Sequence, residues 1–316
     1  MEKQVINDTM KHTLKIFFVS VLAAVAVISC KTDKNGQEEI SETLTAGRTT
    51  IMVDNTIQPA VEDVLDVFHS VYDRAHVTQV NATETDLVNA LLSDSVSVVV
   101  MPRLLTEKES TYFKQRSIEP HITPFATDAI AFITNKTSKD TVVDLEEVLK
   151  VLKGQSSDKI KKLIFDNPNS STVQQLLKLA GVKQVPSQNV YSLKTNDEVI
   201  RYVHDTPGTI GIVGVNWLSE PTQKMAKFVS GVTVLAVDNV KIDKGVKKYY
   251  KPTQSNLATG SYPLTRKLYV LNYSNRDGLG MGFATYIGAF EGQRIILKSG
   301  LLPVELPSRE VNVASE

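Results

Sequence analysis

Residues 166–172 carry the side chains in this sequence that are best suited to bind a small polar ligand. They read Asp-Asn-Pro-Asn-Ser-Ser-Thr and lie between an apolar run at 163–165 and a run with helical apolar spacing at 173–179. This order predicts a strand, a polar loop and a helix start, with Asn169 or Ser170 as the N-cap. The free N–H groups of a first helical turn and the positive end of the helix dipole favour an anion there. The segment therefore predicts an anion site that needs no nucleophile or base; the alternative is a plain helix cap.

Two other polar loops follow predicted strands in the same way. Asn55 and Thr56 follow the β-rich run 49–54, and Thr83 lies in the polar stretch 81–85 after the next strand. In sheets of this kind the binding loops lie at the carboxyl ends of the strands. All three loops are rich in hydroxyl or amide side chains and precede a helix, so they are candidates for one shared site.

The elements that position these loops alternate between strands and helices. Short β-branched or apolar runs predict strands over 49–54, 77–80, 96–101, 126–135, 163–165, 190–193, 207–214 and 262–271. Apolar residues at helical spacing predict further helices over 60–72, 87–92, 105–115, 145–152, 196–204 and 280–290. This alternation is the signature of an α/β fold with a mainly parallel sheet.

The N-terminus has the pattern of an exported, lipid-anchored protein. A basic start at 10–15 precedes about 13 apolar or small residues at 16–28, which are too few to span a bilayer comfortably and are typical of a signal peptide. Residues 27–30 resemble the lipobox of bacterial lipoproteins, in which the cysteine, here Cys30, becomes the lipidated first residue. The alternatives are a buried free thiol or a cleaved signal without a lipid.

Composition limits what the rest of the chain can do. Cys30 is the only cysteine among 316 residues, so no intrachain disulfide can form. Residues 31–47 contain no aromatic residue, and we predict that they form a flexible tether. The remaining body of about 270 residues is large enough for two lobes. Lysine plus arginine and aspartate plus glutamate balance at 35 each, so the net charge attracts neither nucleic acid nor an anionic membrane.

The sequence offers little support for an enzyme. Its five histidines show no metal-ligand pair at helical spacing, and it contains no Gly-x-Ser-x-Gly elbow. The glycines at 278–283 approach a dinucleotide fingerprint, but the third glycine comes one position early. The basic aromatic run 247–251 is interpreted as a solvated loop. We therefore predict no catalysis, no cofactor and no metal.

Seven segments resemble, in order, those of the phosphate-binding proteins of bacterial ABC transporters: 53–59, 97–103, 124–132, 170–172, 207–211, 262–269 and 291–303. The resemblance implies a two-lobed type II periplasmic-binding-protein fold, in which each lobe is a mostly parallel sheet flanked by helices. Two crossing strands, near 125–128 and 262–265, would join the lobes. The implied division is a signal peptide at 1–29, the lipidated cysteine and tether at 30–47, lobe I at 48–125 and 266–316, and lobe II at 126–265.

Carried over by position, the resemblance also implies the ligand-binding residues: Asn55, Thr56, Thr83, Ser97, Asn169, Ser170, Ser171 and Thr172. Two charged positions depart from the family pattern. Asp166 stands where the family has the arginine that pairs with phosphate, and Ser97 stands where it has the aspartate that accepts a phosphate proton. Asp166 works against a doubly charged guest, because like charges repel strongly in a cleft of reduced dielectric.

Arg103, Arg201 or Arg266 could reach the cleft and restore a positive charge, although Arg103 and Arg266 match family positions that hold the lobes together. We predict a non-catalytic lipoprotein on the periplasmic side of the cell envelope that captures a small oxyanion, phosphate first, for import by an ABC permease. Asp166 and Ser97 motivate an alternative, in which an envelope protein of this fold has lost phosphate binding and serves a regulatory or protein-interaction role.

Overall fold

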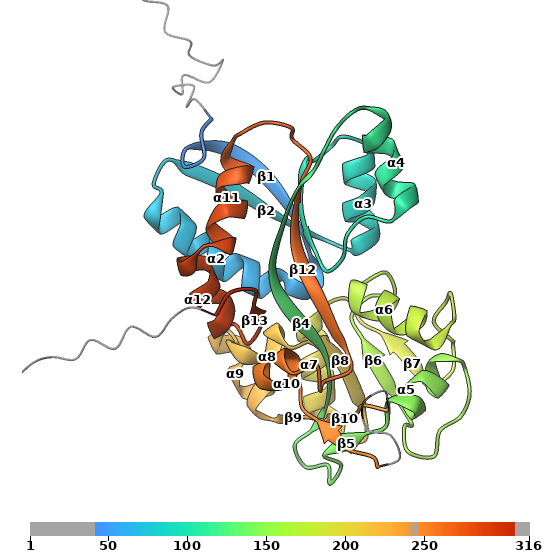
Figure 1. Cartoon of the computed structure of the whole chain (residues 1–316). Coiled ribbons are helices and arrows are strands. Elements are labelled where there is room, and N and C mark those ends of the chain that lie inside the picture. Colours follow the sequence, from blue (N-terminus) through green and yellow to red (C-terminus); the bar gives the residue numbers. More distant parts are fainter. Residues whose placement is uncertain (1–41, 241, 243–245, 307–316) are drawn as a thin grey trace, which may run out of the picture. The chain divides into compact units, whose positions relative to one another are not determined.

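The computed structural model describes residues 42–240, 242 and 246–306 (Figure 1). The predicted signal peptide, Cys30 and the tether up to residue 41 lie outside these residues. Ten of the described strands form one sheet: β1 (Gly47–Asp54), β2 (Ala75–Ala82), β3 (Val98–Met101), β4 (His121–Asn135), β6 (Leu163–Phe165), β7 (Val190–Ser192), β8 (Ile210–Gly214), β9 (Val232–Val234), β12 (Thr265–Asn272) and β13 (Leu302–Pro303). Their order is β2-β1-β3-β12-β4-β8-β6-β7, and β9 and β13 both pair with β4.

The helices connect and cover these strands: η1 (Asn55–Ile57), α2 (Gln58–Val71), α3 (Glu84–Leu92), α4 (Glu107–Gln115), α5 (Leu145–Leu152), α6 (Ser171–Ala180), α7 (Asn196–Asp205), α8 (Asn216–Ser219), α9 (Gln223–Ser230), α10 (Gln254–Ala258), α11 (Leu279–Gly288) and α12 (Phe290–Lys298). A second, small sheet contains β5 (Val142–Val143), β10 (Ala236–Asp238) and β11 (Tyr249–Tyr250). Within the described ranges, no helix has the length and apolar character needed to cross a membrane.

Two groups of parallel strands are joined through β4 and β12. β1 pairs in parallel with β2 and β3, and β6 pairs in parallel with β7 and β8. β12 runs antiparallel to β3 and to the first half of β4, whereas the second half of β4 pairs with β8 and β9. Figure 1 shows β4 and β12 side by side between the two groups. The predicted two-lobed α/β fold with two connecting strands is confirmed, while the lobe boundaries at residues 125 and 265 stay a prediction.

Helices cover both faces of each lobe's sheet, because successive side chains of a strand point to opposite faces and both sets are apolar. In β3, Val98 and Val100 belong to the core that contains α2 and α11, while Val99 and Met101 belong to the core that contains α3 and α4. The second half of β4 alternates in the same way between α5 and α6 on one side and α7 and α9 on the other. Because helices cover both faces, the loops at the strand ends are the part of the sheet left to bind a ligand.

The end of the predicted tether, residues 42–46, packs against α11 instead of being flexible. Glu42 Oε1 accepts a hydrogen bond from the N–H of Leu279 at 3.2 Å. The carbonyl of Leu44 lies directly against Gly282, where a side chain of any kind would overlap it. Composition alone did not reveal this contact, because it depends on a glycine more than 200 positions away in the sequence.

The helix predicted over 280–290 is α11, which ends at Gly288, and a second helix, α12, follows it that was not predicted. α11 and α12 are separated by Ala289, whose ψ of 172° is extended. Gln293 Nε2 donates to the carbonyls of Ile287 at 2.8 Å and Phe125 at 3.0 Å, so a side chain serves a carbonyl left free at the break. Strands β5, β9, β10, β11 and β13 were not predicted either, and β5, β11 and β13 have only two residues each, too few to show alternation.

Candidate functional site

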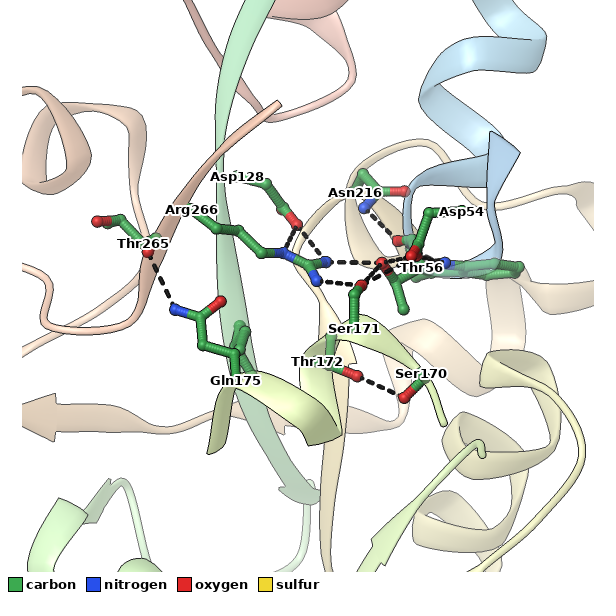
Figure 2. Close-up of polar contacts among 12 residues, drawn as sticks. Asp54, Thr56, Asp128, Ser170, Ser171, Thr172, Gln175, Asn216, Thr265 and Arg266 are labelled. Atoms are coloured by element: carbon green, nitrogen blue, oxygen red, sulfur yellow. Dashed lines mark hydrogen bonds and ion pairs between the residues drawn. The ribbon is translucent and has the colours of Figure 1, made fainter. Parts of the chain in front are cut away.

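Thr56 and Ser171, two of the predicted ligand residues, meet at the centre of the site (Figure 2). Thr56 lies in η1 directly after β1, and Ser171 is the first residue of α6. Their hydroxyl oxygens are 2.9 Å apart, although 115 positions separate the two residues in the sequence. Both side chains are buried. Two of the three predicted strand-to-helix loops therefore converge, one from each lobe.

Asp54 accepts hydrogen bonds from both hydroxyls and from a main-chain N–H. It is the last residue of β1 and the N-cap of η1, and its Oδ1 accepts from the N–H of Thr56 at 2.9 Å. The same oxygen accepts from the hydroxyls of Thr56 at 2.5 Å and Ser171 at 3.0 Å. Sequence reasoning missed this residue as a site member. Its position just before a helical turn was a signal for capping, which is the local part of its role.

A cation reaches the same hydroxyls from the connecting strand β12. Arg266 Nη2 donates to Thr56 Oγ1 at 2.8 Å, and Nη1 donates to Ser171 Oγ at 2.7 Å. Nε and Nη2 also donate to Asp128 Oδ2 on β4, at 2.8 and 2.6 Å. The resemblance implies that Arg266 holds the lobes together, and these contacts do link both lobes. They also bring a positive charge to the loops.

Arg103, the other arginine to which the resemblance gives that role, acts within one lobe. Its Nε donates to Glu84 Oε1 at 2.6 Å, and its Nη1 and Nη2 donate to Glu109 at 2.8 and 3.1 Å. These bonds connect the starts of α3 and α4. Arg103 therefore does not join the lobes through these contacts.

The positive charge of Arg266 acts on three buried carboxyl groups, those of Asp54, Asp128 and Asp166. Burial raises the pKa of Asp54 and of Asp128, and the charge of Arg266 opposes the shift at both. Burial also raises the pKa of Asp166, whose Oδ2 accepts from Asn196 Nδ2 at 3.3 Å. The site thus combines one permanent positive charge with groups that carry up to three negative charges. Within the described residues, no group of three or more His, Cys, Asp or Glu side chains is arranged to hold a metal ion.

The other hydroxyls of the third loop are buried and contact each other. Ser170 Oγ and Thr172 Oγ1 are 3.0 Å apart (Figure 2). Ser170 is the N-cap of α6 by position, but its side chain makes no capping hydrogen bond. A plain helix cap therefore does not account for these hydroxyls. Asn169, by contrast, is exposed, and its main-chain N–H donates to Asn167 Oδ1 at 2.8 Å.

In the part of the chain that the structure describes, the hydrogen bonds of Thr83, from the second predicted loop, stay within the start of α3 and do not reach this network. Thr83 is the N-cap of α3: its hydroxyl accepts from the N–H of Asp86 at 3.3 Å and donates to Asp86 Oδ2 at 2.7 Å. It follows Ala82, which pairs with Asp54, so the loop does lie at the same edge of the sheet. Asn55, from the first loop, is half-buried in η1.

Ser97 lies at the wrong end of its strand to share this site. The parallel register of β1 and β3 pairs Val53 with Val100, so the end of β3 nearest to Asp54 is Met101. Ser97 precedes β3 and lies at the opposite edge of the sheet. This placement contradicts the predicted ligand role of Ser97. The apolar run that follows it offers no polar side chain to fix the alignment, which explains the error.

Two side chains from α8 hold the loop of Thr56 in place. Asn216 Nδ2 and Trp217 Nε1 each donate to the carbonyl of Thr56 at 2.9 Å. Gly214 permits this approach, because a Cβ there would lie 2.8 Å from both Thr56 O and Asn216 Nδ2. Sequence reasoning missed both side chains, and the glycine spacing of the strand over 207–214 was the signal available for such a close approach.

Comparisons with known proteins found a matching family model and similar phosphate-binding proteins. A family model described as the PBP superfamily domain matches residues 40–289. The phosphate-binding protein PstS of Borreliella burgdorferi is 23% identical over 307 residues, which cover 92% of this chain and 98% of that protein. The phosphate-binding protein PstS of Bacillus subtilis is also 23% identical over 307 residues, which cover 94% of each chain.

Solved structures share the fold. A protein from Clostridium perfringens, assigned as the substrate-binding protein of a phosphate ABC transporter and crystallised with bound phosphate, has a TM-score of 0.66 at 15% identity and covers 82% of this chain and 100% of its own. An ABC-type phosphate transport receptor from Vibrio cholerae has a TM-score of 0.59 at 19% identity, with 81% and 100% covered. At these identities the likeness concerns the fold.

Proposed function

Because the chain belongs to the PBP superfamily, we propose that it is a solute-binding protein that captures a small oxyanion, with phosphate as the first candidate, between its two lobes. The observation that carries the proposal is the guanidinium of Arg266, which donates to a hydroxyl from each loop, Thr56 and Ser171. The names of similar proteins, a phosphate-binding protein PstS and an ABC-type phosphate transport receptor, support phosphate as the ligand.

Closure of the lobes would assemble the donors for the anion. Thr56 and Ser171 come from different lobes, so neither lobe alone holds both hydroxyls. The N–H groups at the start of α6, together with the hydroxyls of Ser170 and Thr172, would supply further donors for the oxygens of a tetrahedral anion. Binding and closure are then thermodynamically coupled, because the ligand favours the closed state that presents both sets of donors.

Calorimetric titration with phosphate, sulfate and other oxyanions tests this proposal. A ligand at 100 times its Kd should raise the free energy of unfolding by about 2.7 kcal/mol. Ser171→Ala should weaken binding by about tenfold, because a buried oxygen of the bound anion would lose the hydroxyl that donates to it. Ser93→Ala removes an exposed hydroxyl at the end of α3 and should leave the Kd unchanged. Absence of both binding heat and stabilisation with every oxyanion would contradict the proposal.

The proposal includes export, a lipid anchor at Cys30 and an ABC permease as partner. Its support is the basic and apolar pattern of residues 10–30, which lie outside the described residues. Cys30→Ser should move the protein from the membrane fraction to the soluble fraction and abolish labelling by a fatty-acid analogue, because lasting attachment needs acyl chains. Unchanged labelling and membrane retention in Cys30→Ser would exclude this anchor.

A second candidate is an envelope protein of the same fold with a regulatory or protein-interaction role and no phosphate binding. The buried carboxyl groups of Asp54 and Asp166 favour it, because negative charge beside the loops opposes an anion. Native mass spectrometry on protein purified from its own envelope separates the two candidates. A bound oxyanion would support transport, whereas a stable protein partner without an oxyanion would support the second role.

A further inference from the structure

The carboxylate of Asp54 occupies the acceptor position at which donors of both loops converge. Its Oδ1 accepts from the N–H of Thr56, from the hydroxyl of Thr56 and from the hydroxyl of Ser171, at 2.9, 2.5 and 3.0 Å. Asp54 is 1% exposed, so water has almost no access to it. An oxygen of phosphate or sulfate bound between the loops would need the same donors.

The contacts of the two hydroxyls engage both of their protons. A hydroxyl has one proton to donate and lone pairs with which to accept. Thr56 Oγ1 and Ser171 Oγ each accept from Arg266, at 2.8 and 2.7 Å. The acceptors within reach of their two protons are Asp54 Oδ1, at 2.5 and 3.0 Å, and the oxygen of the other hydroxyl, at 2.9 Å. Neither hydroxyl therefore has a proton left for a ligand while the carboxylate of Asp54 keeps its place.

Charge adds to this competition. Arg266 already donates twice to Asp128, and its positive charge also acts on Asp54. The second carboxylate oxygen, Asp54 Oδ2, is buried and has no hydrogen-bond partner among the described residues. Capping of η1 needs one acceptor, which a neutral serine also provides. The negative charge of Asp54 is therefore not required by the local fold.

We propose that Asp54 is a specificity-determining residue, an internal competitor whose carboxylate must leave the hydroxyls of Thr56 and Ser171 before an oxyanion can bind them. This inference rests on the proposed function. It implies weak capture of oxyanions in general and a preference for singly over doubly charged forms, because repulsion by Asp54 grows with the charge of the ligand.

The test is titration of the full chain with inorganic phosphate and with sulfate at neutral pH. Asp54→Ser keeps an N-cap but removes the carboxylate, and Asp54→Asn keeps the shape without the charge. Both variants should bind phosphate at least about tenfold more tightly than the wild type. Asp277→Asn is the matched control: it removes the same charge from the exposed loop after β12, at the opposite edge of the sheet, and should leave the Kd unchanged.

Other results of this titration would overturn one or both of the proposals. Equal affinity in the wild type and both Asp54 variants would overturn the competition and leave phosphate capture standing. Loss of binding in variants that remain folded by circular dichroism would also overturn it, because Asp54 would then be part of the ligand site. Binding by the variants alone would support the competition and contradict phosphate capture by the native chain. No binding by any of the proteins would overturn both proposals.

Discussion

The contribution of a buried charged residue of this site to stability depends on whether it has an ion-pair partner. Arg266 and Asp128 form a two-bond pair with exposures of 6% and 0%. Such a pair contributes little net stability, but loss of one partner is strongly destabilising because the other charge stays buried. Asp166 differs from Asp128, since it is 2% exposed and has no ion-pair partner within the described residues. Its charge should lower the stability of the folded state.

Asp166→Asn should therefore raise the free energy of unfolding at neutral pH, by roughly 1 kcal/mol or more. Burial raises the pKa of Asp166 in the folded state, so the folded state binds this proton more readily than the unfolded chain does. The stability from that proton is fully present below the unfolded pKa and is lost as the pH rises through the folded pKa. The variant has no carboxyl group to ionise, so it keeps its stability as the pH rises. Its free energy of unfolding should therefore exceed that of the wild type by an amount that grows with pH and vanishes below about pH 4.

Urea unfolding at a series of pH values measures this difference. Asp158→Asn, an exposed aspartate of the same lobe, is the matched control and should change stability by less than about 0.5 kcal/mol. An advantage of Asp166→Asn that is the same at low and neutral pH would show that packing, and not charge, causes it.

Among the elements, local patterns predicted the segments but not the contacts between them. The strand before Asp166 and the helix from Ser171 followed from apolar spacing, and the structure has them as β6 and α6. The bond from Arg266 to Thr56 joins residues 210 positions apart, and no periodic pattern marks such a pair. Asp54 was missed as a site residue for the same reason, since its role depends on a hydroxyl from the other lobe.

The contact between the chain before β1 and α11 leads to a prediction at this scale. A Cβ at Gly282 would overlap the carbonyl of Leu44, which is main chain and cannot rotate away. Gly282→Ala should displace residues 42–46 and cost roughly 1–3 kcal/mol. Gly288→Ala is the control in the same helix, because the nearest atom to its Cβ, on Thr123, is 3.4 Å away. Limited proteolysis and thermal unfolding measure both effects, and equal Tm values for the two variants would refute the overlap.

For the molecule as a whole, a few polar contacts between loops accompany the two continuous strands. β4 and β12 run through both lobes, whereas Thr56 is bound by Ser171, Asn216 and Trp217 from the other lobe. Each such hydrogen bond contributes about 0.5–1.5 kcal/mol net. A set of this size can be broken and remade by a ligand whose own contacts are of similar strength. The closed arrangement should therefore respond to the ligand.

Trp217 is the only tryptophan of the chain, so its fluorescence can report closure without a label. Its indole N–H donates to the carbonyl of Thr56 across the two lobes, and the side chain is half-buried. If phosphate shifts the population toward the closed state, acrylamide should quench Trp217 less at saturating phosphate than without it. Ser171→Ala should move the midpoint of this change to higher phosphate, in line with its weaker calorimetric Kd. Unchanged quenching, at a phosphate concentration that calorimetry shows to be saturating, would mean that the lobes are equally closed with and without the ligand, and binding would then have to proceed without the coupled closure proposed for this site.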